Sequence, residues 1–173
     1  MNAFWKVLLN AVSLASMSTV PGLAQVPSTW PGGTVLVTLH AEGAQIYECK
    51  PELDEKSPSQ GRALTWQFRE PIATLVADGK SSGRHYAGPS WDYIDGSGVK
   101  GKVAASAPGA TPGDIPWLQL DVSEHRGEGI LSKVTIVRRI NTKGGVAQGS
   151  CESAGHYLSV PYSADYVFLR KND

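Results

Sequence analysis

Two histidines and a cluster of aromatic residues are the side chains in this sequence whose types could do chemistry. His40 and His85 each adjoin a segment with strand character, so they could converge from separate strands to bind copper or zinc. The sequence contains neither H-x-H nor H-E-x-x-H, so no local spacing specifies a metal. The alternative is that each histidine, like His125 and His156, is a hydrogen-bonded residue at a strand end or on the surface.

The segment 83–101, GRHYAGPSWDYIDGSGVKG, holds the second candidate site. Trp91 and Tyr93 are two residues apart, so on a strand they share one face, whereas His85 and Tyr86 point in opposite directions. Such a row of rings could stack on a saccharide ring or another flat apolar ligand, with charged residues at its margin. It could equally be core, because large aromatics supply most of the burial in a small β domain. The candidate ligand-binding residues are Arg84, His85, Tyr86, Trp91 and Tyr93.

No pattern typical of nucleophilic catalysis accompanies these residues. A G-x-S-x-G elbow is absent, and Ser90, Ser97 and Ser150 lie in glycine-rich segments where turns favour a small polar residue. Glycosidase chemistry depends on the separation of two carboxyl groups in space, which the sequence does not give for Asp92 and Asp95. We assign no catalytic residue and favour a binding role over an enzymatic one.

The elements that must position these residues follow a period of two rather than 3.6. Short runs rich in β-branched and aromatic residues are separated by turn signals such as Asp78-Gly79, which predicts a tight hairpin. The sequence therefore predicts an all-β, single-domain antiparallel sandwich or barrel. The predicted strands are residues 34–40, 44–49, 63–68, 72–77, 116–122, 133–140 and 166–170. The predicted long surface loops are residues 49–62 and 106–114, and the predicted core pairs are Trp66 with Phe68 and Tyr166 with Phe168.

The N-terminal residues have the features of a secretory leader. Lys6 precedes an apolar stretch from Val7 to about Val20, which is too short to span a bilayer as a helix, and a helix break and small residues follow. We expect residues 1–24 to be a signal peptide and residues 25–173 to be one secreted or periplasmic domain. No second long apolar run follows, so we expect no membrane span.

The charge of the chain is close to neutral. The 16 Lys and Arg residues balance the 16 Asp and Glu residues, and removal of the leader takes away Lys6, so the net charge becomes 15 − 16 = −1. Nucleic acids and anionic lipids both require a concentrated basic face. We therefore expect neither to be the main partner.

Cys49 and Cys151 both lie after the predicted leader, and an exported protein meets an oxidising environment. We predict a disulfide between them, which would join an early strand to a late loop. The alternative, a pair of metal-binding thiolates, lacks the close spacing of zinc sites.

Six phrases in order give the sequence a resemblance to a known family. They are AEGAQIYEC, TWQFREPIATL, GRHYAGPSWDYIDGSGVKGK, IPWLQL, INTKGG and VPYSADYVFLR. Over nearly all of residues 25–173 the chain resembles the secreted family designated domain of unknown function 3455 (DUF3455). The resemblance implies an exported, predominantly β domain and no activity that can be transferred residue by residue.

Some members of that family carry the label malate dehydrogenase, and one motif tests whether NAD binding fits this chain. Gly96, Gly98 and Gly101 spell G-x-G-x-x-G, and Asp121 follows at about the distance of a ribose-binding acid. These glycines bind a dinucleotide only at a strand-to-helix turn. The residues after them, KVAASAPGATPGD, cannot form the long helix, so we interpret the glycines as turn or bulge positions.

The sequence therefore favours a secreted β-sheet binding module for an apolar or saccharide ligand, without a cofactor. The alternative is a copper- or zinc-dependent secreted metalloprotein that uses His40 and His85.

Overall fold

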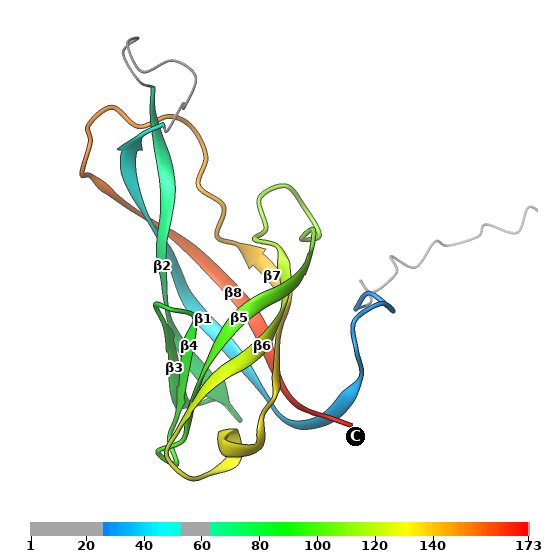
Figure 1. Ribbon diagram of the computed structural model, residues 1–173. Coiled ribbons are helices and arrows are strands. Elements are labelled where there is room, and N and C mark those ends of the chain that lie inside the picture. The colour runs from blue at the N-terminus through cyan, green and yellow to red at the C-terminus, as the bar shows by residue number, and fades with distance from the viewer. Residues whose placement is uncertain (1–25, 53–62, 173) are drawn as a thin grey trace, which may run out of the picture.

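The computed structural model describes residues 26–52 and 63–172, which form a closed antiparallel barrel (Figure 1). Each strand pairs with the next along the chain, and the first strand closes the barrel by pairing with the last. The strands are β1 (Gly33–Pro51), β2 (Leu64–Ala77), β3 (Lys80–Tyr86), β4 (Ser90–Tyr93), β5 (Gly98–Ala107), β6 (Trp117–Arg126), β7 (Ile136–Gly144) and β8 (Tyr157–Lys171), and a 3-10 turn, η1 (Ile130–Lys133), joins β6 to β7. The all-β prediction is confirmed, and the architecture is a barrel.

Two predictions concern residues outside the described ranges, one of them wholly and the other in part. The expected signal peptide and most of the expected loop 49–62 lie outside the described residues. In the described part of the chain, no helix is long and apolar enough to cross a membrane.

Side chains alternate across the barrel wall, which is why the period of two identified the strands. On β1, Leu39 and Ala41 are fully buried inside the barrel, whereas His40 and Glu42 are exposed outside. The inward residues join one hydrophobic core, and the outward residues meet solvent.

The predicted strands 34–40 and 44–49 are one continuous strand, because Gly43 lets β1 pass close to β2. A Cβ atom at Gly43 would lie 2.1 Å from the carbonyl oxygen of Ile72, closer than any real contact. The glycine that interrupts the apolar pattern in the sequence therefore preserves the strand pairing.

The glycine-rich segment 83–101 contributes to three strands, which the sequence did not resolve. Asp78 and Gly79 form the predicted tight hairpin between β2 and β3, with φ angles of 48° and 72°. Gly96, with φ of 88°, lies in the turn between β4 and β5. Turns and strands therefore alternate rapidly here, and β4 has only four residues.

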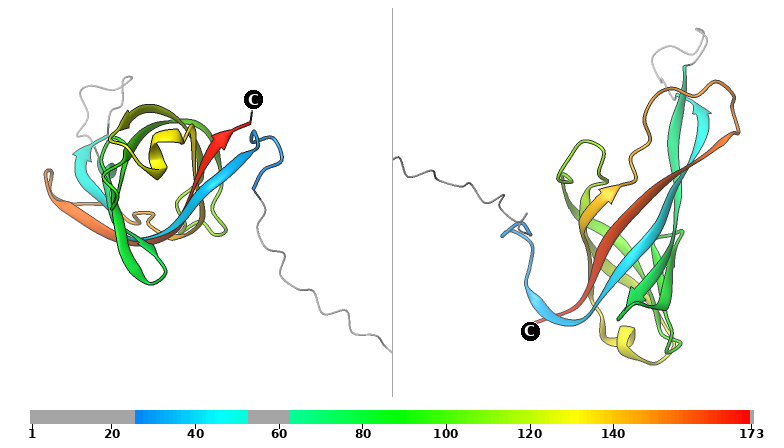
Figure 2. Two further views of the ribbon diagram at one scale, coloured as in Figure 1. Left: turned by 90° about the horizontal axis from the view of Figure 1, so that it is seen from below. Right: turned by 180° about the vertical axis from the view of Figure 1, so that it is seen from behind.

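The interior of the barrel is filled by aromatic and aliphatic side chains. The Trp91 ring packs edge-on against Tyr166 and Phe168, with centroid distances of 5.4 and 6.2 Å. Seen from below, η1 lies across one end of the barrel, where Leu131 and Val134 are buried in the core (Figure 2). The interior at this level is packed core.

The predicted disulfide is confirmed. Cys49, near the end of β1, is bonded to Cys151 in the connection between β7 and β8, 102 residues later. The bond fixes that long connection to the β1–β2 hairpin, which projects beyond the other strands (Figure 1).

One predicted core pair is confirmed and the other is wrong in part. Tyr166 and Phe168 are buried, but Phe68 is 55% exposed and Trp66 is half-buried. The reason is that β2 pairs with β3 only from Ala73 onward, so among the described residues the part of β2 that carries Trp66 and Phe68 has a strand partner on one edge, β1.

Candidate functional site

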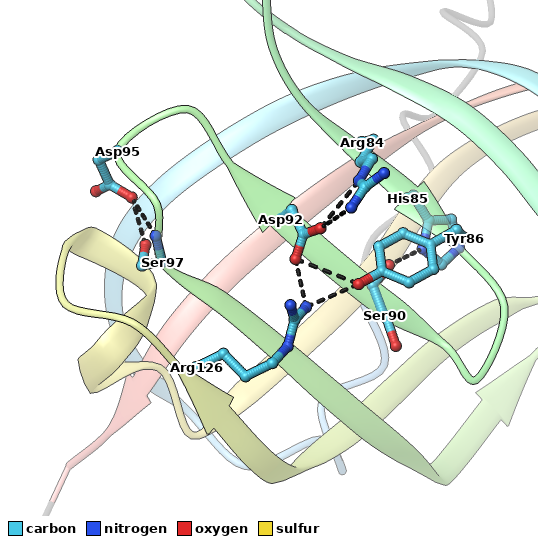
Figure 3. A network of polar contacts seen from close by, with 8 residues as sticks. All are labelled: Arg84, His85, Tyr86, Ser90, Asp92, Asp95, Ser97 and Arg126. Carbon is cyan, nitrogen blue, oxygen red and sulfur yellow. Dashed lines mark hydrogen bonds and ion pairs between the residues drawn. The ribbon is translucent and has the colours of Figure 1, made fainter.

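The predicted ligand-binding residues all lie on the β3–β4 hairpin, but on both sides of the barrel wall. Figure 3 shows three of them, Arg84, His85 and Tyr86. His85 is paired with Trp91, and both face the interior with exposed fractions of 2% and 1%. Arg84 and Tyr86 face outward, as alternation along the strand requires. Tyr93 is half-buried and packs against the core. No single surface carries all five residues. Of the two alternatives for Trp91, core residue or part of a ligand platform, the structure shows a core residue.

His85 is a buried, uncharged core residue. Its ring stacks on Trp91 with a centroid distance of 4.7 Å and an interplanar angle of 8°, and the Tyr166 ring lies 4.8 Å away. Nδ1 donates a hydrogen bond to the carbonyl oxygen of Ser90 at 2.9 Å. The pKa of His85 is lowered from 6.5 to about 3: burial is the main cause, the bond to Ser90 acts in the opposite direction, and the positive charge of Arg139 adds to the lowering.

The outward residues of the same hairpin form a network around Asp92. Arg84 donates from Nε and Nη2 to Oδ2 of Asp92 at 2.9 and 2.8 Å. Arg126, on β6, donates to Oδ1 of Asp92 and, at 2.7 Å, to the hydroxyl oxygen of Tyr86. The Tyr86 hydroxyl donates in turn to Oδ1 of Asp92 at 3.3 Å. The network therefore links β3, β4 and β6 on the outer wall.

The environment of Asp92 suits a structural role rather than proton transfer. Burial by itself would raise the pKa of Asp92, but the hydrogen bonds from Arg84 and Arg126 outweigh it, and the pKa lies below its usual range. A general base near neutral pH needs the opposite tuning. A Cβ atom at Gly98 would lie 2.7 Å from Oδ1 of Asp92, so this glycine makes room for the network.

Asp95 belongs to a separate network and does not face Asp92 as a catalytic pair. Its Oδ1 accepts hydrogen bonds from the backbone nitrogen and the hydroxyl of Ser97, at 2.9 and 2.5 Å. Its Oδ2 accepts from the backbone nitrogen of Ile130 at 2.8 Å. The carboxylate thus attaches the β4–β5 turn to η1.

His40 lies on the opposite side of the wall from His85. Its Nδ1 is 2.8 Å from Oδ1 of Asp165, and its Nε2 is 3.7 Å from Oε1 of Glu42. The structure therefore does not bring His40 and His85 together. Within the described residues, no group of three or more His, Cys, Asp or Glu side chains is arranged to hold a metal ion.

The G-x-G-x-x-G motif lies in the β4–β5 hairpin, and no strand-to-helix turn is present there. Gly96 is in the turn, and Gly101 lies at a register shift between β5 and β6. A Cβ atom at Gly101 would lie 3.1 Å from Cβ of Leu120 and 3.4 Å from the Trp91 ring. The interpretation as turn and bulge positions is confirmed for Gly96 and Gly101, whereas Gly98 is a paired residue at the start of β5.

A concave site that the sequence did not reveal lies beside Trp117, the first residue of β6. It is a recess of about 470 Å³ between the β5–β6 loop and the end of β7. Leu118 and Leu120 pack on the inner core, so Trp117, which is 5% exposed, belongs to the outer face of the strand. The recess is lined by Ala110, Thr111, Asp114, Trp117, Asn141, Thr142 and Lys143.

Asp114 fixes the rim of this recess. Its Oδ1 accepts a hydrogen bond from the backbone nitrogen of Gly144 at 2.6 Å, and its Oδ2 accepts from the nitrogen and hydroxyl of Thr111 at 2.9 and 2.7 Å. The Gly144 bond, with those from Thr111, lowers the pKa of Asp114. The spacing of Thr111 and Asp114 within the sequence TPGD suits such a closed turn. The bond to Gly144 on β7 could not be expected from local spacing, because Gly144 lies 30 residues away.

These observations define a class of protein: a small antiparallel β-barrel with a packed interior, one disulfide, and a candidate binding recess on its outer wall. The chain belongs to the family described as Protein of unknown function (DUF3455), whose family model matches residues 76–170. The match runs from the end of β2 to the end of β8 and confirms the resemblance to this family. Four of the six phrases lie within it, and AEGAQIYEC and TWQFREPIATL precede it. Comparison with curated proteins gave no match, and comparison with solved structures gave none either.

Proposed function

We propose that the protein is an exported binding module that holds a small, largely apolar ligand in the recess beside Trp117. The observation that carries this proposal is a recess of about 470 Å³ whose rim Asp114 already fixes in the structure. Small-molecule sites are typically concave, preformed, and of about 300–1,000 Å³. The recess has the size and the rigidity of such a site.

The packed interior supports a site on the wall rather than inside the barrel. Eight-stranded barrels that enclose a ligand leave room for it between the strands. Here Trp91, Tyr166 and Phe168 occupy that space and are almost completely buried.

Most polar side chains of the recess already have hydrogen-bond partners, which favours an apolar ligand over a saccharide. The oxygens of Asp114 are already bonded, Asn141 donates to Asp165 at 2.8 Å, and Thr142 donates to the carbonyl oxygen of Ile115 at 2.6 Å. A sugar needs many hydrogen-bond partners and an exposed ring face, whereas Trp117 is only 5% exposed. The amino group of Lys143 remains to bind one acceptor group of the ligand.

Export is supported by the leader-like residues 1–24 and by the disulfide between Cys49 and Cys151, which persists in oxidising compartments. Mass spectrometry of the protein recovered from the periplasm or medium is expected to give an N-terminus at Gln25. Recovery in the cytoplasm with an intact N-terminus would contradict export.

The binding proposal is tested by fluorescence titration of the oxidised protein, residues 25–173, with the neutral apolar dye Nile red. We expect saturable binding that Ala110→Trp abolishes, because the new ring fills the recess from its exposed rim. Ala104→Trp is the matched control, since Ala104 is exposed on β5 and does not line the recess. Equal binding by the two variants would refute the proposed site.

Thermal melts of the same variants in the presence of oligosaccharides, copper and zinc separate the other predictions. A ligand that binds only the folded state raises the unfolding midpoint by mass action. A saccharide-dependent rise that Ala110→Trp removes would replace the apolar ligand by a sugar at the same site. A metal-dependent rise that chelator reverses would favour the metalloprotein prediction, with His40 and His85 changed separately because the structure keeps them apart.

A further inference from the structure

A second recess, of about 940 Å³, lies at the end of the barrel where η1 and the last residues of β8 meet. Lys133 is the last residue of η1, and Arg170 to Asn172 lie at the end of the described chain. The lining residues are Lys133, Thr135, Arg170, Lys171 and Asn172. Three of the five are cations, and none of the five is an acid.

This recess groups three cations at one place. Elsewhere, some exposed cations face carboxylates, such as Lys100, 3.0 Å from Glu124, and Arg84, 2.8 Å from Asp92, whereas Lys80 and Lys102 are single lysines with no ion pair among the described residues. Among the described residues, no carboxylate lies within ion-pair distance of any of the recess's three cations. A chain whose net charge is close to zero therefore concentrates positive charge at one concave place.

The hydrogen bonds around the recess use up acceptors and leave donors. Oγ1 of Thr135 accepts a bond from the backbone nitrogen of Lys171 at 2.8 Å, which leaves its hydroxyl hydrogen to donate. Oδ1 of Asn172 accepts from the hydroxyl of Thr34 at 3.0 Å, which leaves its amide NH2 group. A lining of cations, a hydroxyl hydrogen and an amide NH2 group complements an anion rather than a cation.

The anchoring of these residues also limits how far they can move. The backbone nitrogen of Thr135 donates to the carbonyl oxygen of Leu169 at 2.9 Å, so the segment that follows η1 is held against β8. Lys133 and Arg170 are thus carried by two segments that are bonded to each other.

We propose that this recess binds an oxyanion, the sulfate or phosphate group of an esterified small molecule. A guanidinium matches the geometry of such a group through paired N–H donors, and two lysines add point charges. The volume of the recess exceeds that of a bare ion, which favours an ester with a further portion in contact with the barrel. This site is distinct from the recess beside Trp117 and does not depend on the function proposed there.

The test is isothermal titration calorimetry of the oxidised protein with sulfated and unsulfated forms of one oligosaccharide, and with a sugar phosphate and its parent sugar. We expect the charged form of at least one pair to bind and its neutral form not to bind. Lys133→Gln and Arg170→Gln are each expected to weaken binding by about tenfold, the loss of one charged hydrogen bond. The matched controls are Lys80→Gln and Lys102→Gln, which remove exposed lysines outside the recess.

Binding of the sulfated sugar alone, or of the sugar phosphate alone, supports the proposal and identifies the ester. Absence of binding by either charged form would overturn it, and so would equal affinity of the recess variants and the lysine controls. Because the lining side chains are near the surface, far-ultraviolet circular dichroism is expected to show folded variants. Lys171→Gln provides a third recess variant if one of the others does not fold.

Discussion

The burial of His85 makes the stability of the barrel depend on pH between about 6.5 and 3. Its pKa is about 3 in the folded protein, against 6.5 in an exposed histidine. As the pH falls below 6.5, the unfolded chain binds a proton at this position and the folded chain does not. The stabilisation is therefore complete above pH 6.5 and is lost progressively as the pH falls towards 3.

The size of the effect follows from the two pKa values. Between pH 6.5 and 3, each pH unit lowers the free energy of unfolding by about 1.4 kcal/mol, which gives about 3 kcal/mol between pH 7 and pH 4 for the pKa of about 3 at His85. Arg139, on the non-adjacent strand β7, adds to the lowering as a like charge. The Tyr166 ring on β8 packs on His85 and stays neutral because burial raises its pKa. The loss is a large part of the stability of a small domain.

Urea unfolding of the oxidised protein at pH 7, 6, 5 and 4 measures this contribution. The comparison uses His85→Gln, which keeps an N–H donor near the carbonyl of Ser90, and His85→Phe, which keeps a ring against Trp91. Both variants are expected to be less stable than the natural protein at pH 7 and to show a slope with pH that is smaller by about one proton. A slope equal to that of the natural protein in both variants would refute the reasoning.

Three further changes test the core, the disulfide and the strand pairing. Trp91→Ala is expected to lower the free energy of unfolding by about 3 to 5 kcal/mol, because it leaves a cavity among Tyr166, Phe168 and His85. A thermal midpoint equal to that of the natural protein would show that the ring is not part of the core. Replacement of Cys49 and Cys151 by serine removes a link between residues 102 apart and is expected to cost about 4 to 5 kcal/mol in urea unfolding, so a loss below about 1 kcal/mol would contradict a stabilising role. Gly43→Ala places a Cβ atom 2.1 Å from a β2 carbonyl oxygen and is expected to cost at least about 1 to 3 kcal/mol of unfolding free energy. The control Gly32→Ala, whose Cβ atom meets nothing within 4 Å, is expected to be neutral. Equal stability of the two variants would show that β1 and β2 can separate without cost.

The sequence predicted the strands with clear alternation and missed those with many glycines. Residues 83–101 read as turns because glycine has low β propensity. In the structure, however, a Cβ atom at Gly83 would lie 2.1 Å from the carbonyl oxygen of Asp92, so the glycine is needed for the close pairing of β3 with β4. The same residue type therefore marks a turn at Gly96 and a strand at Gly83, and only the neighbouring chain distinguishes them.

The candidate recess beside Trp117 could not be predicted, because its parts are far apart in the sequence. The β5–β6 loop supplies Ala110 and Asp114, and β7 supplies Asn141 to Lys143. The bond from Gly144 to Asp114 joins these parts, and pairing around the whole barrel determines that they meet. The local spacing of residues gives no information about how the strands pair around the barrel.

By itself, the sequence determined the all-β class, the tight turn at Asp78-Gly79 and the burial of Tyr166 and Phe168, because backbone preference and side-chain alternation act over a few residues. It determined the disulfide because only two cysteines were present. Alternation shows that two residues share a face of a strand, but not which face is inside. Closure of the barrel decided which face is inside, and it placed Trp91 with His85 in the core. It placed Arg84 and Arg126 around Asp92 on the outside. It also formed the two recesses, where segments far apart in the sequence meet.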